Sequence, residues 1–90
     1  MSSFHLATPI KLLDAHDERI AFLYSLSGGD FDGRVVLISS LILPNHRETS
    51  IFLCDFDGND VEWGNSLSTI PYVDAEKALN QMGYSTKITT

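Results

Sequence analysis

The chain lacks the features that mark several classes of protein. Cys54 is its single cysteine, so no intramolecular disulfide replaces a hydrophobic core. Basic residues are scarce, 6 Lys and Arg against 12 Asp and Glu, and the net charge of −6 disfavours binding to nucleic acid. No apolar run is long enough to cross a bilayer, and we expect no signal peptide, because the first residues lack a basic segment followed by an apolar core. We therefore expect a cytoplasmic protein with neither a nucleic-acid nor a membrane partner.

Recognisable catalytic and metal-binding motifs are also missing. The three histidines, His5, His16 and His46, have no metal-ligand spacing with another His, Cys or Glu. No serine lies in a Gly-x-Ser-x-Gly elbow. We therefore expect no catalytic residue, no bound metal and no cofactor.

One short motif has chemical interest. The apolar run from Ile51 ends in Asp55-Phe56-Asp57-Gly58, and it resembles the first motif of haloacid-dehalogenase-type phosphatases. The resemblance implies that Asp55 is a nucleophile and Asp57 an acid or base beside magnesium. The segment after Gly58 is too short to supply the remaining parallel strands and catalytic groups, so we reject this enzyme. A strand followed by Asp-Gly is also typical of a hairpin, and we expect a hairpin turn at residues 57–59.

Three apolar stretches dominate what is present. They cover residues 20–24, 35–43 and 51–54, and each is apolar at successive positions rather than at alternate ones. A strand with one face in water alternates apolar and polar side chains, whereas a strand covered on both faces does not. These stretches therefore predict strands that are covered on both sides.

The pattern predicts one α+β domain over residues 1–90. We expect an antiparallel meander of five or six strands with one C-terminal helix packed on one face, curled toward a small barrel at most. The turn residues between apolar runs place the strands. The expected strands are residues 19–26, 34–43, 49–55 and 60–63, with a final edge strand at residues 84–88.

The helix is predicted from Tyr72 onward. Pro71 suits the first helical turn, Ser68 or Thr69 is the expected N-cap, and Gly83 ends the helix. Three- and four-residue spacing places a set of apolar side chains on one helix face. The members of this set are Ala75, Ala78, Leu79 and Met82.

The first nineteen residues allow two interpretations. Leu6, Ile10 and Leu13 fit the spacing of a helix, but the residue before Pro9 avoids helical geometry. We prefer a strand that forms a hairpin with residues 19–26. The helical alternative remains open, because a second helix would also cover a sheet face.

One helix is too narrow to cover both faces of the central strands. Burying five apolar side chains contributes about 10 kcal/mol, which rivals the whole stability of a small domain. The second face is therefore covered by barrel closure, by the N-terminal segment or by a second copy. Of these three, the sequence favours a homodimer.

Turn chemistry suggests a second surface. In a meander, alternate turns lie at the same end of the sheet, so the turns at residues 28–33 and 56–59 are expected to be neighbours. They would form an acidic, aromatic-tipped patch that suits a basic protein partner. The patch consists of Asp30, Phe31, Asp32, Phe56, Asp57 and Asp60. The opposite end would carry His16, Arg19, His46 and Arg47.

Small size, acidity and missing catalytic motifs favour a non-catalytic binding module. Such a protein would act through protein–protein contacts, as an inhibitor, an adaptor or an immunity-type protein does. The alternative is a small-molecule binding protein with an apolar pocket between sheet and helix. Tyr24, Trp63 and Tyr72 are the expected lining of that pocket.

Overall fold

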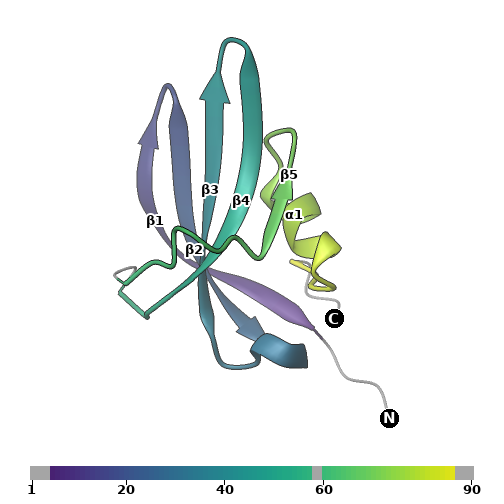
Figure 1. The fold of residues 1–90 in the computed structure, drawn as a ribbon. Helices are drawn as coiled ribbons and strands as arrows, with labels where there is room; N and C mark the ends of the chain where they lie inside the picture. The colour runs from purple at the N-terminus through teal and green to yellow at the C-terminus, as the bar shows by residue number, and fades with distance from the viewer. Residues whose placement is uncertain (1–4, 58–59, 87–90) are drawn as a thin grey trace.

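A computed structural model describes residues 5–57 and 60–86 as one open, slightly curled antiparallel sheet with a helix beside it (Figure 1). The strands follow one another in the order β1-β2-β3-β4-β5. This architecture confirms the predicted α+β meander with a single C-terminal helix. The elements are β1 Leu6–His16, β2 Arg19–Ser27, the short 3-10 helix η1 Gly29–Phe31, β3 Val35–Leu43, β4 His46–Cys54, β5 Ser68–Ile70 and α1 Ala75–Gln81.

The N-terminal segment is a strand, as preferred from the sequence. β1 pairs with β2 along its whole length, from Leu6 opposite Ser27 to His16 opposite Arg19. Two irregularities interrupt the pairing, one between Pro9 and Lys11 and one between Leu12 and Asp14. Each places one extra residue in β1, as a β-bulge does. β1 is therefore an edge strand of the sheet and does not cover either face.

One face of the sheet, the helix face, carries the larger core. The core includes Val36, Ile38 and Ile51 from the central strands, with Ala78 and Leu79 from α1. Ala75 and Met82 pack against it, so the predicted apolar face of the helix is confirmed. Apolar burial on this face fixes the position of α1 against β4 and β5.

The helix begins later than the sequence predicted. Ser68 and Thr69 do not cap it, because they belong to β5, which pairs with β4. Asp74 is the N-cap, and its carboxylate accepts a hydrogen bond from the backbone N–H of Lys77 at 3.0 Å. Gly83 follows the helix with a φ of 89°, as expected for a C-terminal glycine.

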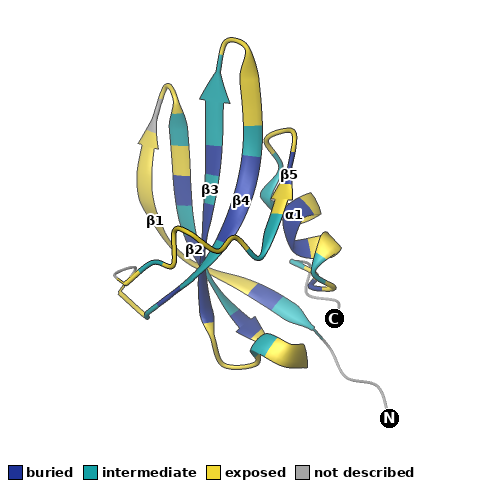
Figure 2. Ribbon diagram, viewed as in Figure 1, coloured by how far each residue is buried: buried dark blue, intermediate teal, exposed yellow. Residues whose placement is uncertain are grey.

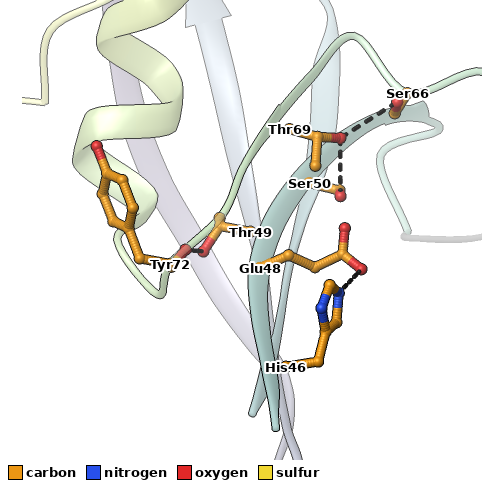
Figure 3. Close-up of polar contacts among 7 residues, drawn as sticks. All are labelled: His46, Glu48, Thr49, Ser50, Ser66, Thr69 and Tyr72. Carbon is orange, nitrogen blue, oxygen red and sulfur yellow. Dashed lines mark hydrogen bonds and ion pairs between the residues drawn. The ribbon is translucent and has the colours of Figure 1, made fainter. Parts of the chain in front are cut away.

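A buried hydroxyl explains why residues 71–74 are not helical. Thr49 on β4 is fully buried, and its Oγ1 donates to the carbonyl oxygen of Tyr72 at 2.8 Å (Figure 3). The same oxygen accepts from the backbone N–H of Asp74 at 3.0 Å and bonds the Ser40 hydroxyl at 3.1 Å. These bonds fasten the segment between β5 and α1 to the sheet.

The opposite face, the loop face, carries a second and smaller core. Ala21, Leu23, Val35, Leu37 and Cys54 are buried there. The described residues of the connection from β4 to β5, 55–57 and 60–67, run across this face (Figure 1), and Val61 packs on its core. This cover is none of the three arrangements expected from the sequence.

The connection also corrects two local predictions. Residues 60–63 do not form a strand, although the backbone N–H of Glu62 donates to the carbonyl oxygen of Leu53 at 3.0 Å. The fifth strand is the three-residue β5 instead. The predicted hairpin turn at residues 57–59 and the end of the predicted strand at residues 84–88 lie partly outside the described residues. Within them, Ser85 makes one parallel bridge to Leu6.

Candidate functional site

The helix face is uncovered toward the tips of the β1–β2 and β3–β4 hairpins. Figure 2 shows buried residues where the strands pass α1 and exposed or half-buried ones beyond it. Direct pairing with β2 places Leu12 on the same face as Phe22. Leu12 is 50% exposed and Ile20 is 36% exposed, both high for large apolar side chains. We call this surface the bare half; its residues are Leu12, Ile20, Phe22 and Ile42.

Tyr24 marks the border between the bare half and the covered core. Its ring centroid lies 5.5 Å from that of Phe22, and the side chain also packs against the main core. Burial raises the pKa of the Tyr24 hydroxyl, and the negative charge of Glu76 on α1 raises it further. The phenol therefore stays neutral at physiological pH, and the nearby charge at this border is the carboxylate of Glu76 on α1.

The expected acidic turn patch is brought together only in part. Both turns lie at the same end of the sheet, and Asp60 and Phe56 line an open hollow of about 340 Å³ with Gly33 and Arg34. Phe56 is 74% exposed, as an aromatic tip requires. The hollow is not lined by the residues of η1.

Phe31, by contrast, is not an exposed tip. It is half-buried and packs against the main core. Its backbone N–H donates to the hydroxyl of Tyr84 at 3.3 Å, and that hydroxyl donates to the carbonyl oxygen of Gly28. Asp32 accepts from the backbone N–H of Gly28 at 2.7 Å, which closes the turn. The Phe31 side chain, predicted to lie at the exposed tip of this turn, is therefore packed inside the fold.

The two carboxylates of the phosphatase-like motif form a local turn. Oδ1 of Asp55 accepts from the backbone N–H of Asp57 at 3.1 Å, and Asp55 but not Asp57 lines the hollow. The surrounding sheet is antiparallel, unlike the parallel sheet that the resemblance implies. Among residues 5–57 and 60–86, no group of three or more His, Cys, Asp and Glu is placed to hold a metal ion.

The three aromatic residues expected to line a pocket do not share one. Tyr24 lies on the helix face, whereas Trp63 lies on the loop face, 5.1 Å from the ring of Phe52 and 5.2 Å from the guanidinium carbon of Arg19. Tyr72 is exposed at the start of the segment that leads to α1. The Arg19–Trp63 contact was not predicted from the sequence, because no residue spacing indicates that the connection between β4 and β5 crosses the sheet.

Cys54 is buried at the end of β4. Its thiol lies 3.8 Å from the carbonyl oxygen of Val35. Burial, and to a lesser degree the charge of Asp55, raise the pKa of the thiol to about 11. At neutral pH it is therefore a protonated core group and a poor nucleophile.

Comparison with known proteins yields no relative. No family model matches the chain, and no curated protein or solved structure is significantly similar to it. No helix in the described part of the chain is long and apolar enough to span a membrane.

Proposed function

We propose that this chain is a non-catalytic protein-binding module that binds its partner through the bare half. The exposure of Leu12 and Ile20 on an otherwise well-packed sheet face carries the proposal. Contiguous exposed apolar surface is typical of protein–protein interaction sites. Polar strand ends and turns surround it, as a polar rim surrounds the core of an interface.

The chain's acidity supports a second feature of the proposal. The net charge of −6 would guide a basic surface toward the protein, with Phe56 and Asp60, at the opposite end of the sheet from the bare half, as a secondary contact. A small-molecule role is less well supported. The hollows that the structure describes are open, and the three aromatic residues expected around a pocket are separated.

Site-specific photo-crosslinking tests this function. A photoreactive amino acid replaces Ile20 in the bare half or, as the matched control, the exposed Asn80 on α1. We expect a discrete protein adduct from position 20 and none from position 80 when the protein is incubated in an extract of the cells that express it. Equal labelling from both positions, or a small molecule as the only adduct at position 20, would contradict a protein-binding role.

A further inference from the structure

We propose that a second copy of this chain binds along the outer edge of β1, by antiparallel pairing of the two β1 strands around a two-fold axis. The inference goes beyond the proposed function, because it concerns the edge of the sheet and leaves the bare half uncovered for its partner. Its structural basis is the outer edge of β1. Ser85 pairs with this edge through His5 and Ala7. Beyond Ala7, no strand of the described chain lies outside β1.

An open strand edge is a template for another strand. Its outward N–H and C=O groups point away from the neighbouring strand of the sheet, and they can bind a second strand by main-chain hydrogen bonds. Beyond Ala7, β1 continues for nine more residues to His16 and is apolar at its centre. Ile10, Leu12 and Leu13 are all exposed there.

The charges on β1 select a second copy as that strand. Lys11 lies opposite Leu23 and Asp14 lies opposite Ala21. Leu23 and Ala21 are buried in the same core on the loop face, so Lys11 and Asp14 share that face. In a regular strand a spacing of three would put them on opposite faces, and the bulge between Leu12 and Asp14 is what aligns them.

This arrangement is complementary to itself. When the two-fold axis passes between Leu12 and Leu13, each Lys11 lies opposite Asp14 of the second copy. Opposite charges at directly paired positions stabilise two strands, and like charges destabilise them. A register centred on residue 11 or on residue 14 would instead oppose two lysines or two aspartates. The charges therefore favour a single register.

The same register joins the two bare halves. Leu12 lies opposite Leu13 of the second copy, next to Phe22 on the adjoining strand. The apolar surfaces of the two copies become one continuous surface on the helix face. The assembly is isologous and closed, so neither β1 edge remains open to a third chain.

The features of β1 also resemble protection against pairing. Bulges, Pro9 and a lysine are common on edges that must stay single. A protected edge carries charges that repel a second copy, however, whereas Lys11 and Asp14 attract one in the register above. Pro9, which has no N–H, falls opposite residue 16 at the end of the paired segment and interrupts little of the ladder.

Charge-reversal variants test the pairing by sedimentation over a range of concentrations. We expect the unchanged protein to dimerise, and K11E or D14K alone to raise the dimer dissociation constant about tenfold or more. An equimolar mixture of K11E and D14K should recover the dimer as a heterodimer, because both opposite-charge pairs reform. K77E on α1 and D57K in the turn after β4 make the same changes in charge away from β1, and should leave association unchanged.

Several results would overturn the pairing without touching the proposed function. They are a protein that stays monomeric throughout, single variants that behave like the controls, and a mixture that recovers nothing. If a single variant does not fold, the double variant K11E/D14K tests the pairing instead. It restores both opposite-charge pairs between the two copies, so the proposal requires it to dimerise. In each failed case, crosslinking from position 20 still reports separately whether the bare half binds another protein.

Discussion

The two halves of the helix face use similar side chains with opposite outcomes. Near α1, Ile38 and Ile51 are fully buried under Leu79. Toward the hairpin tips, Leu12 and Ile20 occupy the same face of the same sheet and remain exposed. The difference lies in the cover and not in the strands. An apolar strand in a sequence therefore indicates that a face is suited to burial, but not which part of the fold, or which partner, covers it.

The largest expected contrast comes from shortening one isoleucine in each half. Ile51→Ala should lower the free energy of unfolding by about 2–5 kcal/mol, because it leaves a cavity in a packed core. Ile20→Ala should cost less than about 1 kcal/mol, because its side chain is already partly in water. Urea denaturation at low protein concentration measures both. Equal losses would mean that Ile20 is buried in solution and that the comparison is wrong.

The hydrogen bonds that attach α1 to the sheet give a second contrast. Thr49→Val removes the hydroxyl that serves Tyr72, Asp74 and Ser40, and should cost about 1–3 kcal/mol because it leaves buried polar groups unpaired. Thr69→Val changes a hydroxyl that bonds Ser50 and Ser66 in a more exposed place (Figure 3), and should cost about 1 kcal/mol or less. A Thr49→Val protein as stable as the unchanged one would show that α1 does not depend on this junction.

The loop face offers a smaller effect. Trp63→Ala removes an aromatic contact with Phe52 and a cation–π contact with Arg19, for an expected loss of about 1 kcal/mol, since more than half of the indole is already exposed. Trp63→Phe, the conservative variant, should recover most of it. A loss as large as that of Ile51→Ala would indicate that the connection is as strongly packed as α1.

The smallest expected effect is the pH response of Cys54, which tests how well the connection between β4 and β5 covers the loop face. The thiol's pKa is about 11 in the fold against 9.0 for an unperturbed group, so the unfolded chain loses the proton first as pH rises. Its contribution to stability is therefore complete below about pH 9 and is lost between about pH 9 and 11. Alkylation of the native protein by iodoacetamide should stay slow until pH approaches 11. In Val61→Ala the onset should move toward pH 9, and an unmoved onset would show that Val61 does not shield the thiol.

Much of the fold follows from local sequence patterns. Apolar runs separated by turn residues located the strands, and the spacing of Ala75, Ala78, Leu79 and Met82 identified the buried side of the helix. The helix start was wrong because Pro71 suits a first turn equally well in isolation. What displaces that start is Thr49, a residue on another strand, through hydrogen bonds that no local pattern records.

The candidate sites were harder to predict for the same reason. Meander topology correctly placed the two acidic turns at one end, but Phe31 is drawn inward by Tyr84, which lies 53 residues away in the chain. Val61 and Trp63 alternate like strand residues, yet their segment crosses the loop face. The bare half was not predicted: from the sequence, the uncovered apolar surface was expected on the face opposite the helix, whereas it lies on the helix face, beyond the reach of α1.

The two extra residues of β1 have a consequence for how its sequence can vary. One insertion reverses the inside-outside order of all following side chains, and a second restores it. Ala7 and Ala15 accordingly lie on the same face, as they would in an uninterrupted strand, although their partners are Leu26 and Ile20, so the pairing has shifted by two residues between them. Loss of a single residue between them would turn one end of the strand inside out, so gains and losses of length in this strand should be tolerated only in pairs.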